Sequence, residues 1–303
     1  MPALACLGLG YCAQHYAAEF GQRFERIVGT TRSADDVTAL AARRFGGRAV
    51  EMHMFDGKTA GGDLRATIAA AEAVLISAPP TDGVDPVLAV LTDDILRAAA
   101  PRSIVFLSTL GVYANSNGAW IDETVAVVPD LARRGSARRN AEMAWQALGK
   151  RRNVPIAILR LGGIYGPGQN AMIRLLRGDA HRVAKPGHVS NRVHVFDVEQ
   201  AIDAAFERHV DGIFNVVDDE PTSPIEHIAY AANLLGIAPA PEIPFAEAHK
   251  VMTPVALSFY EGCIRARNDK LKNVLGVRLR YPTYREGLRA LHDAGDHLAI
   301  QEK

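Results

Sequence analysis

A glycine-rich segment near the start of the chain has residue types and spacing that suit binding of a phosphate-bearing cofactor. Residues 8–13 read Gly-Leu-Gly-Tyr-Cys-Ala and directly follow the apolar run Ala3–Leu7. In a strand–turn–helix unit, the first glycine permits the tight turn, the second lets the backbone approach a pyrophosphate, and the small last residue allows close packing. The free N–H groups at the helix N-terminus then hold the anion. We predict dinucleotide binding, with an ordinary glycine-rich turn as the alternative, and the expected contacts are Gly8, Gly10, Tyr11, Cys12 and Ala13.

The end of the second apolar run indicates which dinucleotide is bound. A site for NAD usually places Asp or Glu about 20 residues after the first glycines, where it binds the ribose hydroxyls. That place has no acid, and Thr31, Arg32 and Ser33 instead offer hydroxyls and a guanidinium that would hold a 2′-phosphate. NADP is therefore favoured over NAD. In the alternative, Ser33 caps the next helix with Asp36 as its partner, and Arg32 is solvated.

The ends of two later apolar runs add further candidate contacts. Asp56 closes the third run, where it would meet the adenine edge or simply form a turn. Ser77, Ala78 and Pro79 end the fourth run. Open α/β sheets bind ligands at the carboxyl ends of their strands, so we expect these residues to border the same cofactor.

The elements that must position these residues follow from an alternation of short apolar runs with longer helical patterns. Runs rich in Val, Ile and Leu without period-two alternation are typical of parallel strands covered on both faces. Strand–helix alternation of this kind predicts a Rossmann-type α/β fold with a doubly wound parallel sheet. The expected strands are Ala3–Leu7, Arg26–Gly29, Ala49–Met54, Ala73–Ser77, Ile104–Leu107 and Ile156–Leu159. The expected helices are Ala13–Arg23, Ala34–Arg44, Asp85–Ala99 and Ser136–Lys150, the last with an apolar stripe of Ala137, Ala141, Ala144 and Leu148.

The composition of the chain changes after about residue 166, where Gly and Pro become frequent. We therefore expect an NAD(P)-binding domain over residues 1–165 and a smaller C-terminal α/β lobe over 166–303 that binds substrate or a partner. Strand character returns at Arg192–Phe196 and Ile213–Val217. We interpret these pieces, near 190–217, as segments that return to the first domain, so that the two parts are interleaved.

Composition limits the classes of function. Of 303 residues, 48% are hydrophobic and 22% charged, and 34 basic residues balance 34 acidic ones. A net charge of zero gives no reason to expect nucleic-acid or membrane binding. The three cysteines are sparse and lack metal-type spacing, which favours a reducing cytoplasm and no metal site. No signal peptide or run long enough to span a membrane is evident. We expect a cytoplasmic monomer or homodimer that acts on a small molecule.

Several motifs together resemble the extended short-chain dehydrogenase/reductase superfamily, which contains NAD-dependent sugar-nucleotide epimerases and dehydratases. The resemblance covers nearly the whole chain, because the motifs occur in the expected order. They are the turn at 8–13, Ser-Thr-Leu-Gly-Val-Tyr at 108–113, Leu-Arg-Leu-Gly-Gly-Ile-Tyr-Gly-Pro-Gly at 159–168, Arg-Val-His-Val-Phe-Asp-Val at 192–198 and Phe-Asn-Val-Val-Asp-Asp-Glu-Pro at 214–221.

The chain departs from this superfamily at the residues that usually carry the chemistry. The resemblance implies a Tyr-x-x-x-Lys pair, in which the tyrosine transfers a proton while the nicotinamide carries hydride. None of the eight tyrosines has Lys four residues later, and the alignment ending at Glu142 places Arg134 and Arg138 at the two positions. Arginine stays protonated, so Arg134 cannot relay a proton. Arg138 would still donate to a ribose or phosphate, or else pair with Glu142 one turn on.

Three functions remain open for such an atypical member. The first is an oxidoreductase with a substitute proton donor, Tyr113 or Tyr165, helped by Ser108 or Thr109; the alternative is that these four residues only contact ligand or pack. The second is a non-catalytic NADP-binding redox sensor or partner-binding module. The third is a sugar-nucleotide epimerase or dehydratase, which the missing tyrosine disfavours. His194 and Cys12 are interpreted as structural residues rather than as a base and a reactive thiol.

Overall fold

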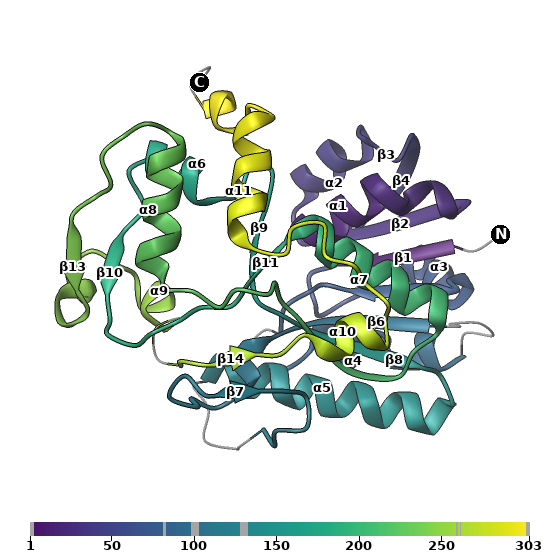
Figure 1. Ribbon diagram of the computed structural model, residues 1–303. Helices are drawn as coiled ribbons and strands as arrows, with labels where there is room; N and C mark the ends of the chain where they lie inside the picture. Colours follow the sequence, from purple (N-terminus) through teal and green to yellow (C-terminus); the bar gives the residue numbers. More distant parts are fainter. Residues whose placement is uncertain are drawn as a thin grey trace.

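The computed structural model describes residues 3–80, 83–97, 103–127, 133–258, 260 and 262–300. Among these residues, an eight-stranded sheet forms the centre of the molecule, with the strand order β12-β8-β6-β5-β1-β2-β4-β3 (Figure 1). Its strands are β1 (Ala3–Leu7), β2 (Arg26–Thr31), β3 (Arg44–Phe45), β4 (Arg48–Met54), β5 (Ala73–Ile76), β6 (Ser103–Thr109), β8 (Ile156–Leu161) and β12 (Gly212–Val216). Every neighbouring pair is parallel except β3 and β4. The doubly wound parallel sheet predicted from the apolar runs is therefore confirmed.

Helices cover both faces of this sheet. Successive strand residues point to opposite faces, so Leu4 and Cys6 of β1 join one apolar cluster while Ala5 and Leu7 join the other. The first cluster includes residues of α1 (Tyr11–Phe20), α2 (Ala34–Ala41) and α7 (Val195–Arg208). The second includes residues of α3 (Gly62–Ala70), α4 (Pro86–Arg97) and α5 (Arg133–Arg152). The 3₁₀ turns η1 (Gly21–Arg23) and η2 (Leu110–Val112) follow α1 and β6.

A smaller lobe lies beyond the carboxyl edge of the sheet, on the side away from the N-terminus (Figure 1). It contains three two-stranded parallel pairs, β9 (Gly163–Tyr165) with β11 (Arg192–His194), β10 (Arg182–Ala184) with β13 (Glu242–Pro244), and β7 (Trp120–Ile121) with β14 (Arg265–Ala266). Its helices are α6 (Ala171–Leu176), α8 (Pro224–Leu234), α9 (Pro254–Ser258) and α11 (Tyr284–Asp293), with 3₁₀ turns η3 (Phe245–Lys250) and η4 (Asp296–Ile300). The short helix α10 (Asp269–Asn273) packs against the main sheet through Leu271.

The structure corrects several predicted boundaries. The helix expected over Ala34–Arg44 ends at Ala41, because Arg44 and Phe45 pair with β4 in a hairpin whose two glycines have positive φ. The strand expected over Arg192–Phe196 stops at His194, whose ring accepts a hydrogen bond from Phe196 N–H and caps α7.

The apolar stripe predicted on the last helix is partly wrong. In α5 the side chain of Ala144 is exposed, whereas Trp145 is 0% exposed and packs on Phe106. The reason is that Ala144 follows Ala141 by three positions, whereas the positions that face the sheet follow it by four and seven, at Trp145 and Leu148. No helix in the described ranges is both long enough and apolar enough to cross a membrane.

Candidate cofactor site

The glycine-rich turn connects β1 to α1 and has the geometry that its sequence predicts. Gly8 has φ +94°, and a Cβ atom added there would lie 2.7 Å from Ala78 N, so only glycine fits. Its N–H donates to Thr30 Oγ1 at 2.8 Å. A Cβ at Gly10 would meet no described atom nearer than Ser77 Oγ, at 3.9 Å. The turn is thus anchored at Gly8 and open above Gly10, where a backbone-bound phosphate needs room.

A pocket of about 540 Å³ lies above this turn, at the point where the strand order reverses on either side of β1. Ligands of open α/β sheets bind at such a switch point, and the volume lies within the usual range for small-molecule sites. The fit to a dinucleotide rests on this cavity, on the open backbone above Gly10 and on the N-terminus of α1. The predicted contacts that line the pocket are Gly8, Gly10, Thr31, Arg32, Asp56, Ser77, Ala78 and Pro79.

Arg43 also lines this pocket, and sequence reasoning missed it. Its guanidinium donates to Gln14 Oε1 at 2.8 Å and lies 4.9 Å from the centre of the Phe45 ring. Gln14 in turn donates to the carbonyl of Leu9 inside the glycine-rich turn, at 3.0 Å. The pocket wall therefore carries two arginines, one after β2 and one after α2. The acidic Asp36 lines the same wall.

Several predicted contacts are packed or hydrogen-bonded within the protein, and of these Asp56 lines the pocket whereas the others lie beside it. Ser33 Oγ accepts a hydrogen bond from Asp36 N–H, which makes Ser33 the cap of α2. Cys12 is buried, and burial raises the pKa of its thiol to about 12, so it is a neutral packing residue, as is the fully buried Ala13. The hydroxyl of Tyr11 donates to the carbonyl of Pro167 at 3.0 Å. Asp56 accepts from two N–H groups of its own turn, and these bonds lower the pKa of its carboxyl.

At the carboxyl end of β6, Arg138 lies where the resemblance places the lysine. Its guanidinium donates to the carbonyl of Leu107 at 2.8 Å and lies 5.7 Å from the Phe106 ring centre. The next strand residues, Ser108 and Thr109, end β6 at this edge of the sheet. The side chain of Arg134 lies outside the described residues.

The predicted catalytic residues lie in different environments: Thr109 is partly exposed, Ser108 is buried beside an ion pair, and the two tyrosines are buried among packed residues. Thr109 is partly exposed and accepts a hydrogen bond from Gly111 N–H, which caps η2. Ser108 is buried and donates to the carboxylate of Glu142, which also pairs with Arg160 at 2.6 Å. The side chains of Glu142 and Arg160 are 3% and 4% exposed, so this is a buried ion pair beneath the edge of the sheet.

Both candidate tyrosines have buried rings. The hydroxyl of Tyr113 donates to Asn215 Oδ1 at 2.9 Å, and burial raises its pKa. The hydroxyl of Tyr165 has no hydrogen-bond partner among the described residues and packs on the backbone of Gly287 in α11, where an added Cβ would lie 2.1 Å away. Burial raises its pKa as well. Both hydroxyls therefore stay protonated and point into the protein, and their role as proton donors remains a prediction.

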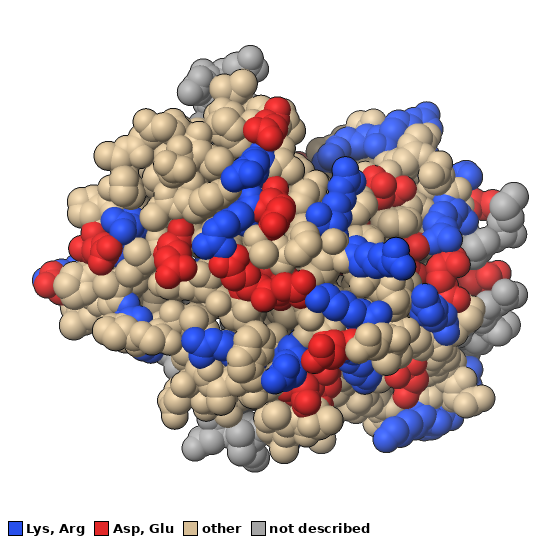
Figure 2. Space-filling model, in the orientation of Figure 1, with Lys and Arg blue, Asp and Glu red and all other residues tan. Residues whose placement is uncertain are grey.

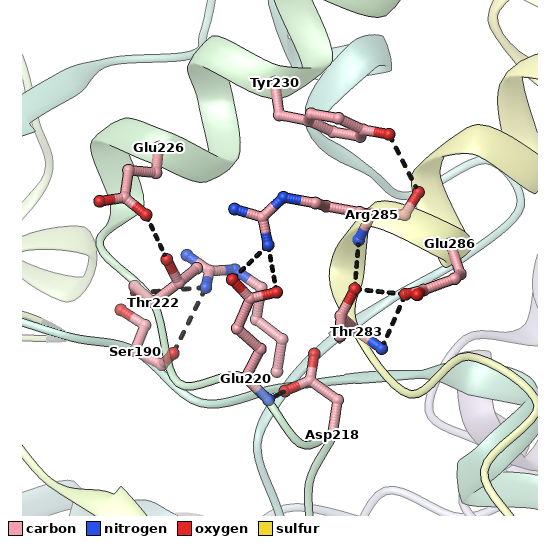
Figure 3. A network of polar contacts seen from close by, with 10 residues as sticks. Ser190, Asp218, Glu220, Thr222, Glu226, Tyr230, Thr283, Arg285 and Glu286 are labelled. Atoms are coloured by element: carbon pink, nitrogen blue, oxygen red, sulfur yellow. Dashed lines mark hydrogen bonds and ion pairs between the residues drawn. The ribbon is translucent and has the colours of Figure 1, made fainter.

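A second cavity, of about 550 Å³, lies in the C-terminal lobe beside the start of α8. It is lined by charged residues of both signs, among them Lys185, Glu226 and Arg265. Figure 3 shows the polar network next to it, where Arg285 pairs with Glu220 and the hydroxyl of Thr222 donates to Glu226. Figure 2 shows acidic and basic side chains interspersed over this face of the molecule. Within the described ranges, no group of three or more His, Cys, Asp or Glu side chains is arranged to hold a metal ion.

Comparisons with known proteins agree with this architecture. No family model matches the chain. A conserved protein of unknown function from Silicibacter pomeroyi DSS is 40% identical and superposes with a TM-score of 0.85, covering 97% of this chain and 99% of that one. UDP-glucuronic acid 4-epimerase from Bacillus cereus, in complex with UDP-glucuronic acid and NAD, is 18% identical with a TM-score of 0.75 and covers 98% and 99%. The 3-diazoavenalumate denitrifying reductase of a Streptomyces species is 27% identical over 201 residues, which are 63% of this chain and 66% of that protein.

Proposed function

Because the chain belongs to the short-chain dehydrogenase/reductase superfamily, as a member without the usual Tyr-x-x-x-Lys pair, we propose that it is an NADP-dependent oxidoreductase. The observation that carries the proposal is the pocket at the switch point, with Arg32 and Arg43 on its wall. Guanidinium groups bind phosphate through charge-assisted hydrogen bonds, and the 2′-phosphate is the group that distinguishes NADP from NAD.

In this proposal each part of the site has a separate task. The turn at 8–13 and the N-terminus of α1 hold the diphosphate, and the residues that follow β2 and α2 hold the 2′-phosphate. Arg138, whose guanidinium donates to the Leu107 carbonyl near the end of β6, would contact the ribose on the nicotinamide side. When bound, the cofactor supplies or accepts a hydride at the carboxyl edge of the sheet.

The absent tyrosine bears on the kind of substrate. Arginine stays protonated, so a residue of this type at the two positions transfers no proton. This favours an acceptor that needs no acid in the hydride step. One such class is a diazonium compound, in which hydride replaces N₂ on carbon: a C–H bond forms, the C–N bond breaks with its electrons on N₂, and no proton is consumed. A diazo compound is also what the name of the Streptomyces reductase describes, which makes this class a candidate beside carbonyl compounds.

Two measurements test the proposal. Titration of NADPH with the protein is expected to change the cofactor fluorescence with saturation, and an unchanged signal would remove the basis of the proposal. NADPH oxidation is then followed with aryl diazonium salts and with ketones across pH 6 to 9. We expect turnover whose rate does not fall with rising pH in the way that the loss of a proton from a catalytic acid would cause. Binding without any turnover would favour the non-catalytic sensor instead.

The two buried tyrosines provide the matched variants for this assay. Tyr113→Phe and Tyr165→Phe are expected to keep most of the activity, since neither hydroxyl is free to donate at the cofactor. A loss of about 100-fold or more in either variant, the size expected for a lost general acid, would show that the tyrosine is a proton donor after all.

A further inference from the structure

A loop between β9 and α6, residues 166–170, is held from one side by the C-terminal segment. The carboxylate of Asp296 accepts hydrogen bonds from Gly168 N–H at 3.0 Å and from Asn170 Nδ2 at 2.7 Å. Asn170 is itself buried, donates to the carbonyl of Gly166 at 3.0 Å and caps α6 through its Oδ1. Asp296 therefore joins residues far apart in sequence and fixes both the backbone and the internal hydrogen bonds of this loop.

The same loop contacts the glycine-rich turn on its other side. The carbonyl of Pro167 accepts the hydrogen bond of the Tyr11 hydroxyl at 3.0 Å. The backbone of Gly166 lies so close that an added Cβ would be 2.7 Å from that hydroxyl and 2.6 Å from Val195 Cγ1. Burial raises the pKa of Tyr11, and the nearby Asp296 carboxylate contributes to this, so the hydroxyl remains a donor.

Tyr11 is the first residue of α1, at the end of the helix that faces the dinucleotide site. The N-cap Gly10 makes no capping hydrogen bond through a side chain, since it has none, and glycine is the most flexible residue. The Tyr11 ring packs edge-on against His15 of the same helix, with 4.5 Å between ring centres, and its hydroxyl ties this first turn to loop 166–170, in addition to the core contacts of the buried Cys12 and Ala13. A first turn that is ordered in advance binds an anion more tightly, because less freedom is lost on binding.

We infer that Asp296 is a positioning residue for the cofactor site: through loop 166–170 and Tyr11 it holds the first turn of α1 in place and slows release of the bound dinucleotide. The inference rests on the proposed function for the identity of that ligand. Figure 1 shows α11, which leads to Asp296, standing between α8 of the lobe and the helices α1 and α2 of the sheet domain. The hydrogen bond from Tyr11 to Pro167 joins the two parts of the chain, and the C-terminal segment holds the loop on which Pro167 lies.

A double-mutant cycle tests the route of action. We compare Asp296→Ala, Tyr11→Phe and the double variant by the rate at which bound NADPH is displaced by excess NADP in a stopped-flow fluorimeter. Each single variant is expected to release NADPH about threefold to tenfold faster, the size of a lost hydrogen bond, and the double variant no faster than the faster single one. The control Asp293→Ala removes a carboxylate that is 70% exposed and contacts only His292 among the described residues, and it should match the wild type. The inference would be refuted if Asp296→Ala released NADPH at the wild-type rate, or if the two single-variant increases in release rate multiplied in the double variant.

Hydrogen exchange tests the same link without cofactor. In Asp296→Ala, the amides of residues 9–14 are expected to exchange several-fold faster than in the wild type and in Asp293→Ala, with the core strands unchanged. Faster exchange confined to residues 166–173 would overturn the inference, and faster exchange everywhere would show a general loss of stability instead and equally reject it. Failure of NADPH to bind the wild type would reject the proposed function but leave this exchange experiment to decide on Asp296.

Discussion

Replacement of Arg43 by Gln is expected to weaken NADPH binding while leaving NADH binding almost unchanged. Arg43 lines the cofactor pocket but is exposed, so part of its interaction with a phosphate is screened by water and salt. A hydrogen bond to a charged group contributes about 1.5 to 3 kcal/mol, and an exposed one belongs at the lower end. Gln14 and the Phe45 ring already hold the guanidinium, so little side-chain freedom is lost on binding. We expect about 1.5 kcal/mol, or roughly tenfold in Kd.

The assay is a fluorescence titration of both cofactors with wild type, Arg43→Gln, Arg32→Gln and the double variant. Since the two arginines approach the pocket from different elements, we expect about 100-fold weaker NADPH binding for the double variant. Arg44→Gln is the control, because it changes the same type of residue at the next position, which lies in β3 and does not line the pocket. The loss should shrink as salt rises from 50 to 500 mM. A double variant that keeps the wild-type ratio of NADPH to NADH affinity would refute the assignment of the 2′-phosphate site.

Three further outcomes follow from buried groups. Burial raises the pKa of Glu199 to about 8 from 4.5, so the folded protein binds more protons than the unfolded chain and loses stability as pH rises from about 4.5 to 8. In thermal or urea unfolding, Glu199→Gln should therefore be as stable as the wild type at pH 5 and more stable by about 3 to 5 kcal/mol at pH 9. Equal stability of the two proteins at both pH values would contradict this prediction. Gly287→Ala should lower the free energy of unfolding by about 1 to 3 kcal/mol, because the added Cβ meets the Tyr165 hydroxyl. Combination with Tyr165→Phe should recover part of the lost stability, and no recovery would show that the hydroxyl does not face α11. Glu142→Gln leaves Arg160 buried without its charged partner and should lower the free energy of unfolding by about 3 to 5 kcal/mol. Combination with Arg160→Met should restore much of this stability. A Glu142→Gln variant as stable as the wild type would contradict the buried ion pair.

The sheet domain could be predicted from the sequence because its signals are local. The runs that form β1, β5 and β8 are strands buried on both faces, whereas the run that forms β4 is largely exposed. The turn at Gly8 was equally predictable, since the positive φ and the close approach of Ala78 both require glycine. Boundaries were less certain wherever a tertiary contact ended the element, as at Ala41, where the pairing of β3 with β4 stops α2.

The contacts that the sequence did not reveal depend on residues far apart in the chain. Arg43 enters the cofactor pocket because α2 ends early and Gln14, on another helix, holds its guanidinium. Asp296 reaches loop 166–170 from the 3₁₀ turn η4. Neither residue has a pattern around it that distinguishes it from an ordinary surface charge. The tyrosines at 113 and 165 had the opposite problem, since their motif marked them while only packing determines where their hydroxyls point.

The exchange of the usual pair for arginines changes what the carboxyl edge of the sheet can do. An N–H of Arg138 donates to the carbonyl of Leu107, which orients the planar guanidinium at the end of β6. A fixed cation of this kind stabilises negative charge at every pH at which the protein is folded, whereas a tyrosine–lysine pair works only near the pKa of its acid. The same edge is stiffened from below by the Glu142–Arg160 pair and its hydrogen bond from Ser108. Arg138 gives this edge a positive charge that stabilises negative charge without supplying a proton.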